Sequence, residues 1–208
     1  MVEGSPEKRR RPGPGRKLAR DRVFEVAADL FYREGIRAVG VEAIVKRAGV
    51  AKISLYRSFP SKDELVLAYL KSRQTEFWRH WDEALGQHQG DPRGQLRAIM
   101  AYLAHRTTQR GYRGCPFLNF SAEFADPAHP GRQVAKAVKR EMRERFVTIA
   151  EALGASRPQQ LADGLLLLVE GAYAISQTLA SGLYGPGTAL VWAAEALIEA
   201  QLRNPTAG

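Results

Sequence analysis

The sequence is poor in the residues that most often carry catalysis or cross-links. Its 208 residues include one cysteine, Cys115, and four histidines. One cysteine rules out a disulfide within the chain, which is typical of proteins in a reducing cytoplasm. The sequence also has no GxSxG motif, no phosphate-binding glycine loop and no group of metal ligands at a recognised spacing. It therefore argues against an enzyme and predicts no metal and no cofactor.

Long hydrophobic runs are absent too. The most apolar run, LLLLV at 165–169, is too short to cross a bilayer and is flanked by Asp163 and Glu170. The basic N-terminus is not followed by the apolar stretch of a secretory signal peptide. No segment alternates apolar and polar residues as a half-buried strand would. We expect an all-α protein in the cytoplasm that has no membrane partner.

What the sequence does contain is an uneven positive charge. The net charge is +9, of which +8 falls in residues 1–62 and +1 in residues 63–208. A protein that is merely basic has no need of such an asymmetry. One strongly basic end predicts a polyanionic partner at that end, such as a nucleic acid.

Glycine and proline divide the chain into helices. An apolar face predicts a first helix that begins near Arg16 and ends at Gly35. A short second helix covers 41–49, and a third ends before Pro60, because the residue that precedes a proline is pushed out of the helical conformation. Ser61 and Glu64 form a capping box for the fourth helix. The later helices are expected over 62–87, 92–106, 117–124, 132–153, 158–181 and 188–202.

A tight turn, AGVA at 48–51, joins the second and third helices. Gly49 supplies the positive φ that such a turn needs. The third helix is short, and its outward side chains are hydrogen-bond donors suited to a DNA major groove. These short helices and their turn predict a helix-turn-helix. The donors are Lys52, Ser54, Tyr56 and Arg57.

Residues 22–65, RVFEVAADLFYREGIRAVGVEAIVKRAGVAKISLYRSFPSKDEL, resemble the DNA-binding domain of TetR-family transcriptional regulators. The family pattern runs from an apolar first helix that ends in LF and a glycine, through an AGV turn, to LY, F, SK and L. One such fragment would carry little weight, but here the whole series occurs in order. The matching residues are Leu30, Phe31, Gly35, Ile44, Ala48, Gly49, Val50, Leu55, Tyr56, Phe59, Ser61, Lys62 and Leu65.

The resemblance implies DNA contacts at the starts of the second and fourth helices and along the third. Lys62 matches a lysine that grips a phosphate at the N-terminus of the fourth helix, where the ammonium and the helix end both favour a phosphate oxygen. The third helix matches the recognition helix. The residues at the start of the second helix are Gly40, Val41 and Glu42, and those along the third are Lys52, Ile53, Ser54, Tyr56 and Arg57.

Three positions depart from the family pattern. Ala51 replaces a frequent serine, so the third helix lacks a side-chain cap worth about 1 kcal/mol. Ile53 replaces a frequent glycine and is either a contact to a thymine methyl group or extra packing. Gly40 replaces a usual Ser or Thr. These departures leave the operator sequence unpredictable.

The N-terminal segment 1–15, MVEGSPEKRRRPGPG, has no apolar periodicity and is expected to be a disordered basic arm. Arginines separated by proline and glycine, just before the first helix, suit a narrow, AT-rich minor groove. The alternative is a tail that only aids solubility. The arginines concerned are Arg9, Arg10, Arg11 and Arg16.

By the resemblance, a DNA-binding domain at 16–64 is followed by a larger helical domain at 65–208 that binds an effector and dimerises. Apolar residues spaced alternately by 4 and 3 form a seam near the C-terminus, and the last helix is apolar along one face. Two such helices from each protomer predict a four-helix bundle between two copies, unless the seam packs within one chain. The seam residues are Leu161, Leu165, Leu168, Ala172, Ile175, Leu179, Leu190, Ala194, Leu197 and Ile198.

An effector pocket in this domain would have an apolar and aromatic lining with a few polar groups, which suits a lipophilic or aromatic small molecule. Taken singly, each candidate is explained more readily as a core residue than as a pocket residue. The candidates are Phe77, Trp78, Trp81, Tyr102, His105, Phe117, Phe120, Phe124, Phe146 and Tyr173.

Two further features have both a plain and a functional interpretation. Cys115 lies in a Gly/Arg-rich loop, RGYRGCP at 110–116, where cations favour a reactive thiolate that senses oxidants or electrophiles; otherwise it is an inert, partly buried thiol. Glu76 and His80 have the spacing to share a metal, but no third ligand is apparent and solvated charges explain them.

The leading hypothesis is a homodimeric, sequence-specific regulator, a repressor released from its double-stranded DNA operator by a small-molecule effector. The alternative is an activator of transcription, because the sequence does not determine where the operator lies in the promoter. A redox- or electrophile-sensing regulator acting through Cys115 and a sequence-independent DNA-coating protein are the competing interpretations. A preference for the protein's own upstream region over random DNA separates the regulators from the coating protein.

Overall fold

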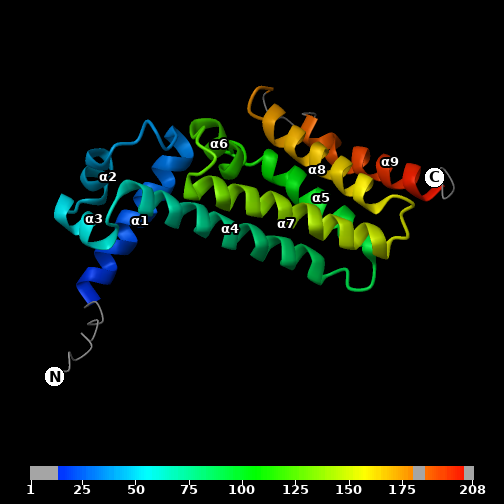
Figure 1. Cartoon of the computed structure of the whole chain (residues 1–208), viewed down its shortest axis with the longest axis horizontal. Helices are drawn as coiled ribbons and strands as arrows, with labels where there is room; N and C mark the ends of the chain where they lie inside the picture. The colour runs from blue at the N-terminus through cyan, green and yellow to red at the C-terminus, as the bar shows by residue number, and fades with distance from the viewer. Residues whose placement is uncertain (1–13, 180–185, 204–208) are drawn as a thin grey trace, which may run out of the picture. The chain divides into compact units, whose positions relative to one another are not determined.

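The computed structural model of the chain describes residues 14–179 and 186–203. Within these two ranges the structure is helical and contains no strand, so the predicted all-α class is confirmed (Figure 1). The helices are α1 (Pro14–Glu34), α2 (Val41–Ala48), α3 (Lys52–Ser58), α4 (Lys62–Gly86), α5 (Pro92–Thr107), α6 (Pro116–Glu123), α7 (Pro130–Ala152), α8 (Pro158–Ile175), the 3₁₀ turn η1 (Pro186–Ala189) and α9 (Leu190–Arg203).

Proline starts helices in this chain more often than it ends them. The helices α1, α5, α6, α7 and α8 all begin at a proline. The missing amide N–H is no loss in the first turn, and the fixed φ of proline is already helical. The expectation that Pro14 and Gly15 belong to a disordered arm is therefore wrong, because α1 begins at Pro14. Residues 1–13, with Arg9, Arg10 and Arg11, lie outside the described residues.

The helix α8 is shorter than the apolar pattern predicted. It ends at Ile175, whereas the sequence favoured a helix to residue 181. The Ser176 hydroxyl donates to the Tyr173 carbonyl oxygen at 3.1 Å, and the Gln177 side-chain amide also reaches this oxygen, at 3.5 Å. Polar side chains that bond to the backbone in this way compete with helix continuation. Leu179, expected in the helical seam, consequently lies outside α8.

The chain divides into two compact units between Tyr69 and Leu70, inside α4. The first unit packs α1, α2, α3 and the start of α4 around buried apolar residues such as Val23, Ile44 and Leu55. The turn between α2 and α3 has the predicted form, since Gly49 has φ +62 and its N–H bonds to the Lys46 carbonyl.

The start of α4 also follows local sequence rules. The Glu64 amide donates to the Ser61 hydroxyl oxygen at 3.1 Å, which is one half of the predicted capping box. No side chain caps α3, in agreement with the alanine at position 51. The DNA-binding candidates are thus placed by short-range turns and caps.

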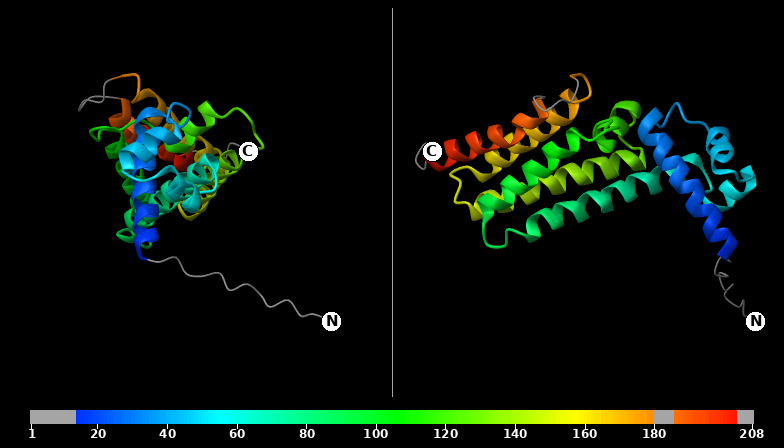
Figure 2. Two further views of the ribbon diagram at one scale, coloured as in Figure 1. Left: turned by 90° about the vertical axis from the view of Figure 1, so that its left-hand side faces the viewer. Right: turned by 180° about the vertical axis from the view of Figure 1, so that it is seen from behind.

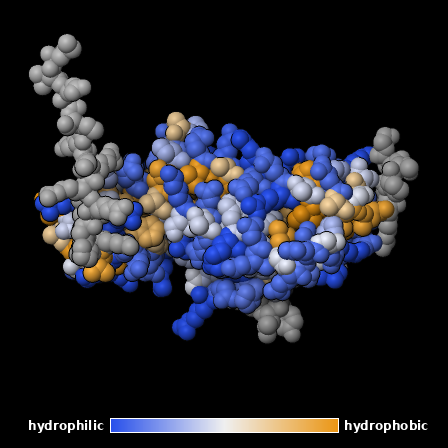
Figure 3. All heavy atoms as spheres, turned by 90° about the horizontal axis from the view of Figure 1, so that it is seen from below, coloured by the Kyte–Doolittle hydropathy of each residue, from blue (hydrophilic) through white to orange (hydrophobic). Residues whose placement is uncertain are grey.

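The second unit contains the rest of α4 and the helices from α5 to α9. Its core is rich in large apolar residues, including Trp81 and Phe146, whose rings lie 5.2 Å apart between centroids. Figures 1 and 2 show α8 and α9 side by side along one edge of this unit. Within the described ranges, no helix is long and apolar enough to cross a membrane. The face shown in Figure 3 is mostly hydrophilic, with hydrophobic residues in separate patches.

Candidate functional site

The short helix α3 presents a polar and aromatic face to solvent. Leu55 faces inward and is fully buried, while Lys52, Ile53, Tyr56 and Arg57 are exposed. Ile53 is 59% exposed, so it does not add to the core, and its contact to a thymine methyl group stays a prediction. The side chain of Ser54 is half-buried. The face combines cations, a phenol and an exposed aliphatic group.

Lys52 is joined to the neighbouring helix. Its ammonium donates to a carboxylate oxygen of Glu42 at 2.5 Å, which ties α3 to the first turn of α2. The hydrogen bond and the charge of Glu42 raise the pKa of Lys52 above its usual value. Both side chains are well exposed, so this pair is open to exchange with an anionic partner. Glu42 therefore holds Lys52 in place when no such partner is bound.

Three more predicted DNA contacts lie at the starts of α2 and α4. Gly40 is exposed and is the N-cap of α2, where it offers backbone but no side-chain cap, and Val41 begins the helix. The ammonium of Lys62 donates to the Ile36 carbonyl oxygen at 2.7 Å, so this lysine already has a partner within its own unit. Its predicted phosphate contact stays a prediction. The side chain of Arg16 lies outside the described residues.

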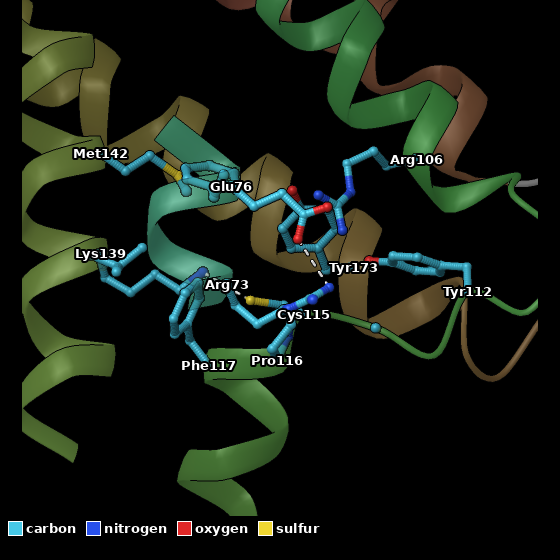
Figure 4. Close-up of a pocket in the computed structure, with 13 residues that line it drawn as sticks. Arg73, Glu76, Arg106, Tyr112, Cys115, Pro116, Phe117, Lys139, Met142 and Tyr173 are labelled. Carbon is cyan, nitrogen blue, oxygen red and sulfur yellow. Dashed lines mark hydrogen bonds and ion pairs between the residues drawn. The ribbon is translucent and has the colours of Figure 1, made fainter. Parts of the chain in front are cut away.

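A pocket lies in the second unit, where α4, α5, α6, α7 and α8 converge (Figure 4). Its empty volume, with the open space at its mouth, is about 420 Å³. Its lining mixes charged, aromatic and aliphatic side chains rather than being apolar throughout. The lining residues are Arg73, Glu76, Phe77, Arg106, Tyr112, Gly114, Cys115, Pro116, Phe117, Val138, Lys139, Met142 and Tyr173.

Of the ten pocket candidates from the sequence, three line the pocket and seven do not. Phe77, Phe117 and Tyr173 line the pocket. Trp81, Phe120 and Phe146 are fully buried core residues outside its lining. The other four, which also lie outside the lining, are Trp78, Tyr102, His105 and Phe124.

Polar contacts explain where some of the remaining candidates lie. Tyr102 stacks on His80 and accepts a hydrogen bond from Arg106 at 3.1 Å. His105 is exposed and bonds to the side chain of Gln109. Hydrophobic periodicity missed the basic residues of the pocket, because a lone cation on a helix normally faces water. The one local signal for this region was the Gly/Arg-rich loop that carries Cys115.

Cys115 is buried and lies against a lysine. Lys139, from α7, places its Nζ 3.4 Å from the Cys115 sulfur and 2.5 Å from a carboxylate oxygen of Glu170 (Figure 4 for the first contact). Burial alone would lower the pKa of Lys139, but the Cys115 sulfur and the Glu170 carboxylate outweigh it and raise that pKa. The ammonium is therefore charged, and it faces the only cysteine of the chain.

Tyr173 forms part of the same wall. It is 4% exposed, and burial raises the pKa of its hydroxyl well above the usual value, so the group stays protonated. The ring of Tyr112 lies 6.2 Å away, and the Lys139 ammonium lies 5.8 Å from the centre of the Tyr173 ring. Neutral donors and a cation thus line one pocket.

Glu76 and His80 do not face a common ligand position. The Glu76 carboxylate pairs with Arg73 at 2.9 Å, and the His80 ring bonds to the Glu76 backbone carbonyl at 2.8 Å. Among the described residues no group of three His, Cys, Asp or Glu side chains is placed to hold a metal.

The predicted seam of α8 and α9 is mostly covered within one chain. Leu161, Leu165, Ala172, Leu190, Ala194 and Ile198 are buried in the protomer, so they are not free to contact a second copy. Leu168 and Leu197 are partly exposed, and Ile175 and Leu179 are exposed. The most exposed large apolar residues of this region are two that the sequence analysis did not select, Leu167 at 73% and Trp192 at 74%. The spacing identified an apolar face but not what covers it.

Comparison with known proteins places the helix-turn-helix in one family. The family model for bacterial regulatory proteins of the tetR family matches residues 23–69. The transcriptional activator FasR of Mycolicibacterium smegmatis is 31% identical over 170 residues, which are 74% of this chain and 72% of FasR. The transcriptional regulator AcuR of Cereibacter sphaeroides is 29% identical over 116 residues, 55% of this chain, and the match spans 53% of AcuR.

Solved structures agree over a larger part of the chain. The TetR-family transcriptional regulator SCO4454 from Streptomyces coelicolor superposes with a TM-score of 0.84 at 29% identity. The superposition covers 89% of this chain and 96% of that structure. The likeness therefore includes the C-terminal helices as well as the helix-turn-helix.

Proposed function

This chain belongs to the TetR family of DNA-binding transcriptional regulators, and from this premise we propose that it is a homodimeric repressor released from its operator by a small molecule. Residues 16–64 bind DNA, and residues 65–208 bind the effector and dimerise. The observation that carries the proposal is the exposed face of α3, where Ile53 and Tyr56 are 59% and 42% exposed on a helix of seven residues. Large side chains left in water on so short a helix are explained by a partner that covers them.

Dimerisation is supported by the outer faces of α8 and α9. Leu167 on α8 and Trp192 on α9 are about three-quarters exposed, and the exposed residues Gly171, Ala196 and Ala200 on these helices are small. An apolar face of this kind, on two adjacent helices, fits the same face of a second copy. Two recognition helices in one assembly would then read two half-sites of an operator.

Effector control is supported by the residues that α4 carries. This helix begins at Lys62 and carries Arg73, Glu76 and Phe77 of the pocket lining on the same continuous helix. A ligand that prefers a different position of α4 would therefore act on both units of the chain. Such a ligand weakens DNA binding only to the extent that it binds the non-binding arrangement more tightly.

The sign of regulation is part of the proposal. FasR is a transcriptional activator, so the relatives of this chain include activators. Repression follows if the operator overlaps the promoter, because the bound dimer then blocks transcription. A transcription assay on the upstream region, with and without the protein, decides between the two signs.

A gel-shift titration tests the proposed function. The purified protein is titrated against fragments of its own upstream region, with random DNA as competitor. Selective retardation supports a specific regulator and supplies an assay for effectors that release the DNA. Equal retardation of both DNAs, lost as salt rises, would instead indicate a sequence-independent coating protein.

A second candidate function is electrophile or oxidant sensing through Cys115. The contact of 3.4 Å between the Lys139 ammonium and the Cys115 sulfur favours it, because a nearby cation stabilises the thiolate, which is the reactive form. The rate of alkylation by N-ethylmaleimide tests this function. Lys139→Gln is expected to slow the reaction of Cys115, whereas Lys136→Gln, at an exposed position of the same helix, leaves the rate unchanged. Equal rates in all three proteins would remove the sensing role.

A further inference from the structure

Arg106 is a cation without an anionic partner in the described part of the chain. It lies near the end of α5, half-buried in the pocket wall, and its Nη1 donates to the Tyr102 hydroxyl oxygen at 3.1 Å. No carboxylate of the described residues lies within 4.0 Å of its guanidinium nitrogens. A guanidinium carries five N–H donors, and most of those of Arg106 have no protein acceptor in the described ranges. Partial burial of such a group is costly unless a ligand or water completes its hydrogen bonds.

The other basic residues of the pocket are already paired. Arg73 bonds to Glu76 at 2.9 Å, and Lys139 bonds to Glu170 at 2.5 Å. Among the described residues, Arg106 is thus the basic side chain of the lining whose charge is left for a ligand. Burial works against its charge, but the hydrogen bond from Arg106 to Tyr102 contributes to a pKa above the usual value, so the guanidinium is charged.

The hydroxyl of a buried tyrosine belongs to the same lining as Arg106. Tyr173 is 4% exposed, and its hydroxyl makes no hydrogen bond to another described residue. Its raised pKa keeps the proton on the oxygen, so it can donate one. In Figure 4, Arg106 and Tyr112 lie on one side of the pocket with Tyr173 next to them, and Met142 and Phe117 lie on the opposite side together with Lys139. The Arg106 side therefore carries a cation without an anionic partner among the described residues, and the opposite side combines apolar side chains with a lysine that is paired to Glu170.

The ion pairs of the lining limit the charge of the ligand. Arg73 is paired with Glu76 and Lys139 with Glu170. One negative charge on a ligand therefore matches the Arg106 guanidinium, and, among the described residues of the lining, a second would meet only cations that already have carboxylate partners. A neutral aromatic ligand, in contrast, would leave the Arg106 guanidinium without a counter-charge. The apolar side chains of the lining, Phe77, Val138 and Met142, suit a hydrocarbon or aryl group. A monoanion with a compact apolar body satisfies both sides.

We infer that the pocket binds a small organic monocarboxylate, with its carboxylate on the Arg106 guanidinium and the Tyr173 hydroxyl and its apolar body against Met142 and Phe117. The inference rests on the proposed role of this pocket as the effector site. The effector is then amphipathic, whereas the sequence alone suggested a lipophilic or aromatic molecule. Charge-assisted hydrogen bonds are about twice as strong as neutral ones, so the charge of the ligand dominates its selection.

Calorimetric titration of the full-length protein tests the inference with matched pairs of probes. Benzoate and hexanoate are compared with benzamide and hexanamide, which have the same shape but no charge, and with inorganic phosphate. The protein is expected to prefer each carboxylate over its amide by roughly tenfold or more, and phosphate to bind weakly. Arg106→Gln is expected to remove this preference. Arg140→Gln, at an exposed position of α7 outside the pocket lining, is expected to keep it.

Several results would overturn the inference. They are equal binding of carboxylate and amide, a preference that survives in Arg106→Gln, phosphate binding as tightly as the carboxylates, and no carboxylate binding at millimolar concentration. If Arg106→Gln does not fold by circular dichroism, Tyr173→Phe takes its place. That variant is expected to lose several-fold in carboxylate affinity and little in amide affinity, and an unchanged preference would equally overturn the inference.

The gel shift separates this inference from the proposed function. A protein that retards its upstream DNA selectively but binds carboxylates and amides alike keeps the proposed regulator role and contradicts the inference. A protein that binds the carboxylates through Arg106 without release of its DNA supports the inference and contradicts effector release.

Discussion

The Lys62 ammonium donates a hydrogen bond to the backbone carbonyl oxygen of Ile36, 2.7 Å away. Ile36 follows α1, and Lys62 is the first residue of α4, so this contact ties the segment between α1 and α2 to the N-terminus of α4. A phosphate oxygen at the same helix end would share this ammonium with the acceptors that the protein already supplies. The Lys62 ammonium therefore has a structural contact within the protein in addition to its proposed contact with DNA.

Replacement of this lysine separates the two roles. Lys62→Ala is expected to weaken binding to operator and random DNA alike and to reduce the slope of log affinity against log salt by about 1 per protomer. Loss of the bond to Ile36 is expected to lower the free energy of unfolding by about 1 kcal/mol. Filter binding over a range of salt measures the slope, with Lys71→Ala, an exposed lysine of α4, as control. A loss of stability with an unchanged slope would leave Lys62 with the structural role alone.

Tyr56→Phe tests the recognition face of α3. Tyr56 is 42% exposed, so loss of its hydroxyl is expected to leave the melting temperature unchanged. Operator affinity is expected to fall by about tenfold, the effect of one hydrogen bond to a base or phosphate. Gel-shift titration with operator and random DNA measures this change. Normal operator binding by the variant would remove the proposed hydroxyl contact.

Trp192→Glu tests the dimer face of α8 and α9. Trp192 is 74% exposed in one protomer, so its replacement is expected to leave the protomer folded. A charge placed in the apolar interface between two copies is costly, and the dimer is expected to dissociate. Size-exclusion chromatography with light scattering measures the mass. Thr75→Glu, which adds the same charge at an exposed position of α4, is the control and is expected to stay dimeric. A dimer of unchanged affinity in Trp192→Glu would place the interface elsewhere.

Glu195→Gln tests the ion pairs between α5 and α9. Arg93 and Arg97 lie 2.7 Å and 3.0 Å from the Glu195 carboxylate oxygens. Burial alone would raise the pKa of Glu195, but the hydrogen bonds from these arginines outweigh it and hold that pKa below the usual 4.5. The stabilising effect is therefore complete above the unfolded pKa and is lost as the pH falls through the folded one.

The variant is expected to melt roughly 2–4 °C below the parent at neutral pH, which corresponds to about 1 kcal/mol for a chain of this size. The difference is expected to shrink as the pH is lowered from neutral to about 3. Thermal unfolding followed by circular dichroism measures it. Glu83→Gln, in an exposed pair with Arg79, serves as control and is expected to show little difference at either pH. If the difference in melting temperature between Glu195→Gln and the parent does not depend on pH, the ionised Glu195 carboxylate is not the source of the stabilisation.

The helix-turn-helix could be predicted from sequence because its determinants are local. Gly49 takes φ +62 where the turn needs it, Ser61 accepts from the Glu64 amide, and α3 ends before Pro60. Local rules gave the wrong answer at a proline, because this residue can either end a helix or begin one. Pro14 begins α1 rather than preventing a helix, because the first turn does not need its missing N–H.

The sequence by itself determined an all-helical chain with a basic helix-turn-helix end, since turns, caps and helical periodicity depend on residues a few positions apart. Only the tertiary structure decided which apolar faces are covered, leaving Leu161 and Leu165 inside the protomer and Leu167 and Trp192 exposed. It alone also brought Arg106, Lys139 and Tyr173 together from α5, α7 and α8. The physical reason is that a pocket is made by helix packing between distant segments, and the spacing of residues along one helix carries no information about its neighbours.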